Sequence, residues 1–262
     1  MTREPLRAPV SVRGLTPTHR PVPASLFGGR YGDSYLLRLE VAQVEDIAPH
    51  VRSLTVASTD LLGFNFTAGQ DLMLDFPQGG RTLRRRYTIR RADPDAGTAD
   101  LEFEIHDGGG VAACWAADTD VGSRLEAIGP RGVITVRPDS ESHIFVTDDS
   151  AIPATFAMIE ALPPGATATA FLVSPHGPES RPVPLGTADT RIRWVEETRL
   201  PEAIRESALP RGVAAYALGE RRLVLSAVDL FVRVGVDRDA IASKAYWRRD
   251  QPNEARGEPA RD

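Results

Sequence analysis

The hydrophobic pattern of the chain changes near Pro138, and this change constrains the fold more than any other feature of the sequence. Before it, short strand-like runs follow one another, several with period-two alternation, separated by Gly, Pro and Asp. They cover residues 35–44, 50–58, 70–76, 85–91, 99–106 and 124–128. Such a succession predicts a small antiparallel barrel or sandwich.

After Pro138, strands alternate with helices, which predicts a parallel sheet with helices on its faces. The expected strands cover 143–148, 166–174, 190–197 and 212–219, and the expected helices cover 150–162, 200–209 and 220–235. We therefore predict an antiparallel β-barrel domain followed by an α/β domain. The predicted parts are an extended or disordered Pro-rich arm (1–34), the barrel (35–138), the α/β domain (139–250) and a disordered tail (251–262).

A glycine-rich turn lies inside the predicted barrel. Gly108, Gly110 and Ala113 fit the G-x-G-x-x-A pattern of a dinucleotide-binding Rossmann unit, and Glu126 follows Gly108 by 18 residues. In a Rossmann domain this turn belongs to the first βαβ unit of a parallel sheet. Here several strands and no helix precede it, so we reject the Rossmann hypothesis for this turn.

Composition excludes several classes of protein. The formal net charge of -5 argues against a protein whose main task is to coat nucleic acid, so an anionic ligand needs a local basic patch. The single cysteine, Cys114, excludes an internal disulfide framework and a site built from several cysteines. Charges and prolines near the N-terminus do not suit a signal peptide, and no window approaches the roughly 18 apolar residues of a membrane span. We expect a soluble, cytoplasmic protein.

The most basic stretch surrounds Arg85. Its basic neighbours are Arg81, Arg84, Arg86, Arg90 and Arg91. An arginine can pair with a phosphate in bidentate fashion, but the same stretch also fits a solvated strand face or an RNA-binding stripe. An RNA surface would need interleaved aromatic residues and a basic domain, and only Tyr87 is near, so we expect no nucleic-acid partner.

The order of the two predicted domains, with the motif Arg85-x-Tyr87-Thr88, resembles the ferredoxin reductase superfamily and its R-x-Y-[S/T] flavin motif. Within it, the chain resembles the siderophore-interacting proteins, which are FAD-dependent ferric-siderophore reductases. Four further stretches carry this resemblance: "HDGGGVAACWA" (106–116), "IGPRG" (128–132), "DDSAIPA" (148–154) and "KAYWRR" (244–249).

The resemblance implies an FAD site. Arg85 would pair with a phosphate, Tyr87 would lie against the isoalloxazine ring, and Thr88 would face its N5 edge. The glycine-rich turn would hold the diphosphate at a helix start, where free N–H groups favour anions. The implied FAD-binding residues are Arg85, Arg86, Tyr87, Thr88, Glu102, Glu104, Ile105, His106, Gly110, Ala112, Ala113, Cys114, Trp115, Ala245, Tyr246 and Trp247.

Other interpretations of these residues stay open. Tyr87 also fits an ordinary cross-strand aromatic pair, and Trp115 fits a core aromatic that seals the barrel. The turn also fits a plain tight turn, and His106 a satisfied polar residue without a proton-transfer role. We expect Cys114 to be a small buried hydrophobic residue.

The resemblance also implies sites for an electron donor and a substrate. NADH or NADPH would bind at Asp149, Ser150, Gly219 and Glu220. Lys244, Arg248 and Arg249 would bind an anionic ferric siderophore, unless they form a basic helix tip that complements the dipole. The segment of Ala245, Tyr246 and Trp247 would fold back on the barrel and cover the flavin.

Two positions depart from the family pattern. Ala113 stands where the family usually has a serine, and Thr147 stands in place of a glycine that lets a nucleotide approach the sheet. Asp148 and Asp149, which follow Thr147, would repel a diphosphate at that point. A positive group for an NADPH 2′-phosphate would come from Arg181, Arg221 or Arg222.

The sequence therefore predicts an oxidoreductase that passes electrons from NAD(P)H through FAD to Fe(III) in a siderophore. No catalytic acid or base and no resident metal is assigned, because the flavin carries the chemistry. Two alternatives remain: a flavoprotein of the same fold fed by reduced ferredoxin, and a non-catalytic protein that binds ferric siderophores.

Overall fold

The computed structural model describes residues 12, 16, 18, 20–22, 34–106, 109–179, 181–182, 186, 188–207 and 209–249. The chain divides into two compact units. The first contains the residues up to Phe66 and Asp71–Arg131, and the second contains Thr67–Gln70 and continues from Gly132. The predicted tail (251–262) and most of the predicted arm (1–34) lie outside the described residues.

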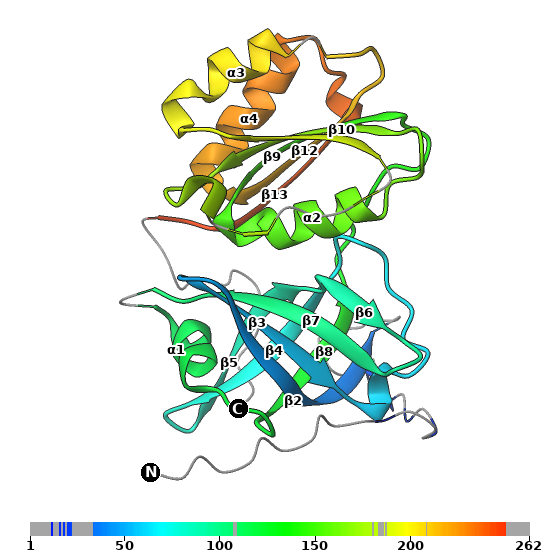
Figure 1. The fold of residues 1–262 in the computed structure, drawn as a ribbon, viewed down its shortest axis with the longest axis vertical. Coiled ribbons are helices and arrows are strands. Elements are labelled where there is room, and N and C mark those ends of the chain that lie inside the picture. The colour runs from blue at the N-terminus through cyan, green and yellow to red at the C-terminus, as the bar shows by residue number, and fades with distance from the viewer. Residues whose placement is uncertain are drawn as a thin grey trace. The chain divides into compact units, whose positions relative to one another are not determined.

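The first unit is a curled antiparallel sheet, as the sequence predicts (Figure 1). Its strands lie in the order β5-β4-β8-β2-β3-β7-β6, with β1 beside β2. Helix α1 lies between β7 and β8 in the chain, so the glycine-rich turn that precedes it belongs to the antiparallel unit. The elements are β1 (Arg20–Pro21), β2 (Tyr35–Ala48), β3 (Val51–Ala57), η2 (Thr59–Leu61), β4 (Asp71–Gln78), β5 (Arg81–Thr88), β6 (Arg91–Asp93), β7 (Thr98–Glu104), α1 (Val111–Asp118) and β8 (Arg124–Arg131).

Strand alternation builds the core of this unit. In β7 the side chains of Ala99, Leu101 and Phe103 are buried, while those between them are half-buried. The sheet curls until β5 approaches β7, where the rings of Tyr87 and Phe103 stack with centroids 4.1 Å apart. Helix α1 adds the buried Ala112 and Ala116 to the same core.

The described residues of the N-terminal arm contact the first unit. β1 pairs with β2, and Val22 packs with Met73 and Ile128. The hydroxyl of Thr18 donates to the buried Asp60 carboxylate. These parts of the arm are therefore bound to the curled sheet.

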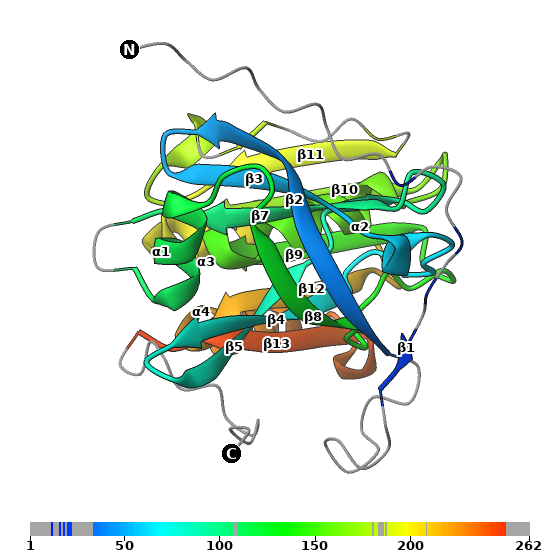
Figure 2. The same ribbon diagram turned by 90° about the horizontal axis from the view of Figure 1, so that it is seen from below.

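The second unit is a parallel sheet with the order β11-β10-β9-β12-β13, which Figure 2 shows in sequence. Helix α2 packs on one face of this sheet through one buried cluster, and α3 and α4 pack on the other face through a second (Figure 1). The elements are β9 (Ser142–Asp148), η3 (Asp149–Ala151), α2 (Ile152–Glu160), β10 (Thr167–Val173), η4 (Gly177–Glu179), β11 (Asp189–Trp194), η5 (Glu197–Arg199), α3 (Leu200–Glu206), β12 (Ala214–Glu220), α4 (Arg221–Arg233), η6 (Arg238–Ala240) and β13 (Ile241–Trp247).

Local sequence explains most of this unit. Helix α4 buries Leu223, Val224, Ala227 and Phe231, which share one helical face. Strand β12 is buried along its whole length, as expected for a parallel strand covered on both faces. Strand β13 was not predicted as a strand. No helix in the described part of the chain is long and apolar enough to cross a bilayer.

Candidate functional site

The flavin motif predicted at Arg85 lies on β5. Arg85 is half-buried and its Nη1 donates to the Arg84 carbonyl at 2.8 Å, while Arg86 is exposed. Thr88 ends the strand and is buried. Arg85 and Tyr87 project from one side of the strand and Arg84 and Arg86 from the other, because side chains alternate along a strand.

Aromatic rings from three elements surround Tyr87. Its ring stacks on Phe103 and meets Phe76 edge to face at 6.4 Å. Trp115, on α1, contacts Phe76 at 5.6 Å and Phe103 at 6.0 Å. The stacking of Tyr87 on Phe103 joins two strands that do not pair, since the partner of Tyr87 in the sheet is Leu72, and Trp115 packs against the barrel core. Burial raises the pKa of the Tyr87 hydroxyl far above its usual value, and the nearby Glu104 carboxylate adds to the rise.

The basic stretch around Arg85 is not a continuous surface stripe. Arg84 is buried and its Nε lies 2.9 Å from Asp75 on the neighbouring strand. Arg90 is also buried, with its Nε 3.2 Å from the Glu102 carboxylate. An RNA-binding stripe would need these guanidinium groups at the surface, so that interpretation is wrong for them. The carboxylate of Glu102 pairs with Arg90 on the side of β7 opposite Leu101 and Phe103.

The turn before α1 has the features that an anionic group needs. Helix α1 begins after its N-cap Gly110, which has no side chain to cap the first N–H groups. Ala112 and Ala113 are buried at this helix start. A Cβ at Gly109 would lie 2.6 Å from the Ala113 Cβ and 3.0 Å from the His106 carbonyl, so the turn requires glycine there. Uncapped N–H groups at a helix start fit a diphosphate such as that of FAD.

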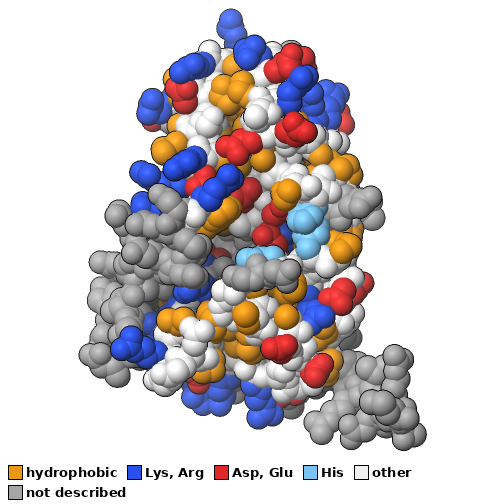
Figure 3. Space-filling model, turned by 90° about the vertical axis from the view of Figure 1, so that its left-hand side faces the viewer, with side chains coloured by type: hydrophobic (Ala, Val, Ile, Leu, Met, Phe, Trp, Pro, Cys, Tyr) orange, Lys and Arg blue, Asp and Glu red, His pale blue; other side chains and the backbone are white. Residues whose placement is uncertain are grey.

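The remaining residues of this turn lie around its rim. Glu104 and Ile105 are half-buried, His106 is exposed, and the backbone N–H of Ile105 donates to the His50 carbonyl at 2.8 Å. Cys114 is exposed, so the expectation of a buried residue is wrong. The buried face of α1 consists of Ala112, Ala113 and Ala116, and Cys114 lies off that face. On the face seen in Figure 3, hydrophobic side chains gather over the part of the barrel that carries α1.

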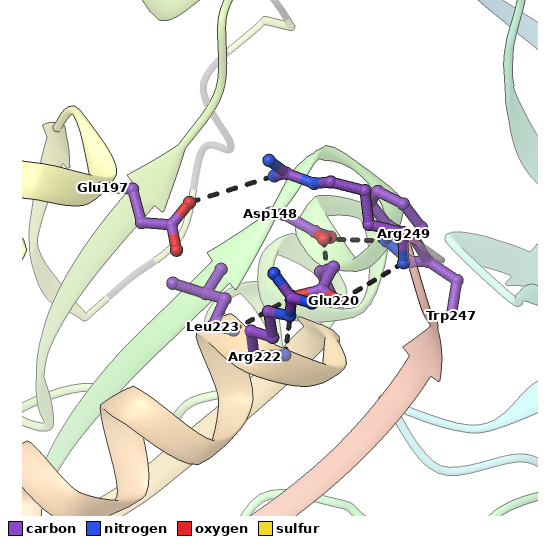
Figure 4. A network of polar contacts seen from close by, with 7 residues as sticks. All are labelled: Asp148, Glu197, Glu220, Arg222, Leu223, Trp247 and Arg249. Atoms are coloured by element: carbon purple, nitrogen blue, oxygen red, sulfur yellow. Dashed lines mark hydrogen bonds and ion pairs between the residues drawn. The ribbon is translucent and has the colours of Figure 1, made fainter. Parts of the chain in front are cut away.

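In the second unit, the residues predicted to bind the electron donor lie at the carboxyl ends of β9 and β12. The Asp148 carboxylate lies at the centre of this region (Figure 4). It accepts hydrogen bonds from the backbone N–H of Ser150 at 3.0 Å and of Glu220 at 2.7 Å, and from the Trp247 indole N–H at 2.9 Å. The Ser150 hydroxyl donates to it as well, at 2.6 Å.

Gly219 makes room for this carboxylate. Its φ of 126° is a conformation that favours glycine, and a Cβ there would collide with the Asp148 side chain. Burial raises the pKa of Asp148 above its ordinary value, while the hydrogen bonds from Ser150, Trp247 and Glu220 lower it. The polar partners therefore hold a carboxylate that is withdrawn from solvent.

Glu220 caps helix α4 in the same region. Its Oε2 accepts from the backbone N–H groups of Arg222 at 2.5 Å and Leu223 at 3.2 Å, and its Oε1 accepts from Arg249 N–H at 3.4 Å (Figure 4). Arg249 also lies 3.9 Å from the Glu197 carboxylate. Beside this network, Arg181 is buried and donates to the Asp149 carbonyl at 2.9 Å. The side chains of Asp148 and Glu220 thus accept hydrogen bonds from backbone amides at this edge.

The predicted substrate residues belong to β13 and the two positions after it. Lys244 lies in a strand, so the alternative of a basic helix tip is wrong. Its Nζ lies 5.5 Å from the centre of the Tyr246 ring, and Tyr246 packs against Ala151 and Leu218. Ala245 and Trp247 are exposed. This segment is the edge strand of the parallel sheet, paired with β12, and its Trp247 is tied to Asp148.

The structure therefore brings the predicted residues together in two groups. The barrel group lies on β5, β7 and α1, and the second group lies at the β9, β12 and β13 ends. Sequence reasoning missed that Asp148 and Glu220 accept hydrogen bonds from their own chain. A signal exists for Asp148, because an Asp two residues before Ser150 at a strand end is typical of an Asx turn.

Two family models match the chain. The model described as "Siderophore-interacting FAD-binding domain" matches residues 64–134, and the model described as "Siderophore-interacting protein" matches residues 140–250. They meet each other near the boundary between the two units.

Curated relatives match over most of the chain. An uncharacterized protein of Mycobacterium tuberculosis is 30% identical over 244 residues, which cover 86% of this chain and 81% of the relative. The ferric vibriobactin reductase of Vibrio cholerae is 24% identical over 83% of this chain and 91% of its own. The NADPH-dependent ferric-chelate reductase of Escherichia coli is 27% identical over 66% and 69% of the two chains.

Solved structures share the fold. A siderophore utilization protein from T. fusca superposes with a TM-score of 0.74 at 24% identity, covering 90% of this chain and 98% of its own. The ferredoxin-NADP+ reductase of Plasmodium falciparum superposes with a TM-score of 0.64 at 13% identity, covering 80% of this chain and 96% of its own. The fold is therefore that of ferredoxin reductases.

Proposed function

Because the chain belongs to the siderophore-interacting protein family, we propose that it is an FAD-dependent ferric-siderophore reductase. Electrons enter from NADPH or NADH and leave to the Fe(III) of a siderophore, which is released as Fe(II). Each nicotinamide oxidised gives two electrons and one proton, so two ferric chelates are reduced per turnover. Bound FAD supplies the conversion between the two-electron donor and the one-electron acceptor.

The start of α1 is the observation that carries this proposal. Its N-cap Gly110 provides no side-chain cap, and the turn at Gly109 has no space for a Cβ. Ala112 and Ala113 would donate backbone N–H groups to the diphosphate, so the missing serine hydroxyl at position 113 costs one hydrogen bond of several. Arg85 would add a charge-assisted bond from β5.

The aromatic cluster of the barrel supports a role in orienting the ring system. Tyr87 is held from behind by Phe103 and Phe76, so its position is fixed before any ligand binds. A rigid aromatic ring loses little entropy when a flavin packs against it. Thr88 follows on the same strand and would face the N5 edge. Ala245, Tyr246 and Trp247 belong to the second unit, and their contact with the flavin stays a prediction.

The basic residues at the end of β13 would receive the substrate. Lys244, Arg248 and Arg249 would attract an anionic ferric chelate by charge. Siderophore oxygens are hard ligands that hold Fe(III) better than Fe(II), so reduction loosens the iron. The protein's own residues then need only to bind and orient the chelate, and no proton transfer is assigned to them.

The test reduces the flavin chemically, so that the result does not depend on which electron donor the protein uses. FAD-loaded protein is reduced with a stoichiometric amount of dithionite under anaerobic conditions and mixed with ferric catecholate, hydroxamate and citrate chelates. We expect the flavin to reoxidise while a ferrous-specific chromogenic chelator traps two Fe(II) per flavin. Reduced flavin that persists with every chelate would refute the reductase. Quenching of tryptophan fluorescence by a chelate without flavin would then favour the non-catalytic binder.

One observation favours the second candidate, a flavoprotein of this fold served by reduced ferredoxin. Asp148 and Glu220 occupy the amide donors of the edge where a nicotinamide nucleotide is expected. Reduction of the flavin by ferredoxin but by neither nicotinamide would support this candidate. Asp149, Ser150, Gly219 and Glu220 would then lose their proposed role in meeting the nucleotide.

A further inference from the structure

The order of the parallel sheet identifies one position where a nucleotide is expected. From β9 the chain moves outward through β10 to β11, and it returns to the other side of β9 with β12 and β13. The topological switch point therefore lies between the carboxyl ends of β9 and β12. In open α/β sheets, ligands bind in the crevice at such a point, with phosphates on backbone N–H groups at helix starts.

Four backbone N–H groups at this switch point already have side-chain acceptors within the chain. The Asp148 carboxylate, at the end of β9, takes the N–H groups of Ser150 and Glu220. The Glu220 carboxylate, at the end of β12, takes the two N–H groups that begin α4. These are hydrogen bonds that a diphosphate oxygen would otherwise accept. Two carboxylates of the protein thus stand in the place of the ligand's phosphates.

Both carboxylates are built into the fold. Asp148 is 9% exposed and Glu220 is 5% exposed, so neither is a mobile surface group. Asp148 also receives the Trp247 indole N–H and the Ser150 hydroxyl, and Gly219 leaves the space that it fills. A phosphate that displaced either carboxylate would break these bonds and leave a negative charge beside its own.

Helix α1 in the barrel provides an internal comparison. Its N-cap is Gly110, which offers no side-chain acceptor to the first amides of the helix. The N-cap of α4 is Glu220, whose carboxylate closes the corresponding amides. Arg181, a candidate for the 2′-phosphate, is 4% exposed and bonded to the Asp149 carbonyl. The two N-cap residues therefore differ: Gly110 offers no side-chain acceptor to α1, whereas Glu220 accepts from the first amides of α4.

We infer that Asp148 and Glu220 exclude the diphosphate of a nicotinamide dinucleotide from the switch point, so that this edge selects dihydronicotinamides by the uncharged nicotinamide end alone. The inference rests on the proposed flavin reductase and defines its donor specificity. The adenosine and diphosphate then add little to recognition, and NADPH and NADH are used alike.

The experiment compares donors with and without a diphosphate. Reduction of the FAD-loaded protein is followed anaerobically with NADPH, NADH and 1-benzyl-1,4-dihydronicotinamide, which has no phosphate. We expect the three values of kcat/KM to agree within about tenfold, since recognition of the shared ring contributes most of the discrimination. Titration calorimetry of the oxidised protein with NADP+ provides a readout that does not depend on activity, and we expect no saturable binding in the micromolar range.

Two variants separate local repulsion from a general loss of charge. Asp148→Asn removes the charge at the switch point and should raise kcat/KM for NADPH at least about tenfold, because contact between like charges is strongly unfavourable. The value for 1-benzyl-1,4-dihydronicotinamide should not rise to match. Glu197→Gln is the matched control: it removes one charge from the exposed rim of the same network and should change neither donor. Tryptophan fluorescence and thermal unfolding of both variants report whether the fold is kept.

Several results would overturn the inference. Micromolar binding of NADP+ to the wild type, a preference for NADPH over the benzyl compound of a hundredfold or more, or equal effects of Asp148→Asn on both donors would each do so. The dithionite experiment keeps this failure distinct from failure of the proposed function. If Fe(II) is released by reduced protein while NADP+ binds tightly, only the donor inference is wrong.

Discussion

The buried ion pair of Arg90 and Glu102 allows a test that separates barrel stability from flavin binding. The two side chains are 6% and 7% exposed, with the Arg90 Nε 3.2 Å from the carboxylate. Removing one partner of a buried pair costs about 3–5 kcal/mol, because the other charge stays in a low dielectric. We therefore expect Glu102→Ala to lower the free energy of unfolding of the barrel by about 3 kcal/mol.

Replacing both partners should behave differently. In Arg90→Leu/Glu102→Leu neither charge of the pair remains, and apolar replacements of buried pairs are often neutral or stabilising. The double variant should therefore recover most of the stability that the single variant loses. A double-mutant cycle over both positions then gives a coupling energy of roughly 2–3 kcal/mol, toward the upper end for contacting residues.

The assay combines urea unfolding with FAD titration. Loss of bound FAD follows the barrel, while circular dichroism includes both units, because Trp194 and Trp247 lie in the second unit. Glu102 was predicted as an FAD-binding residue, but its carboxylate is turned to Arg90, so the double variant should bind FAD within about threefold of the wild type, a difference below 1 kcal/mol. A double variant as unstable as Glu102→Ala would refute the ion-pair argument, and a stable one that loses FAD would place the carboxylate at the cofactor.

Three further predictions address the two sites and the pH dependence of the fold. Arg85→Ala should weaken FAD binding by about 2 kcal/mol, the scale of a lost charge-assisted hydrogen bond. Lys244→Ala should keep FAD and raise KM for the ferric chelate. Equal FAD affinity in Arg85→Ala and the wild type would contradict the assignment of the flavin motif. Gly219→Ala should shift the emission of Trp247, because the new Cβ collides with Asp148, and an unchanged spectrum would contradict that geometry. Burial lowers the pKa of His143 below its ordinary value of 6.5, and the backbone carbonyl of Ser140 opposes this, so the unfolded chain takes up the proton first as pH falls. Stability should thus decrease from about pH 7 downward through 6.5, and His143→Gln should flatten this slope in urea midpoints measured between about pH 7.5 and 5.

Much of the fold follows from local pattern. The alternation in β7 and the apolar face of α4 each decide their own element, since burial of one face follows from the spacing of apolar residues. β13 was missed because Ile241–Trp247 includes Ser243 and Lys244, and as the edge strand of its sheet it tolerates them. Cys114 was placed wrongly although its helical spacing from Ala112 and Ala116 sets it off the buried face.

The interactions of Asp148 could not be read from the sequence for a different reason. Its acceptor role depends on Glu220 and Trp247, which follow it by 72 and 99 residues and meet it only when β12 and β13 pair. From sequence, an acidic residue at this position indicates only repulsion of a phosphate. The structure adds that the charge is held in place by donors, so the repulsion cannot be relieved by rotating a surface side chain.

The N-cap residues of α1 and α4 differ in what they offer to the first amides of their helices. Gly110 before α1 leaves the amides without a side-chain acceptor, and Glu220 before α4 satisfies them within the chain. When an amide already donates to a buried carboxylate, a ligand gains only the difference in free energy between its own hydrogen bond and the bond that it replaces. That difference is unfavourable, because the displaced carboxylate loses its partners. An amide that donates only to water can replace that hydrogen bond with one to the ligand, and no protein carboxylate loses a partner. For this reason we expect the flavin's diphosphate to bind at the start of α1, and we expect no second diphosphate to bind at the amides that Asp148 and Glu220 occupy.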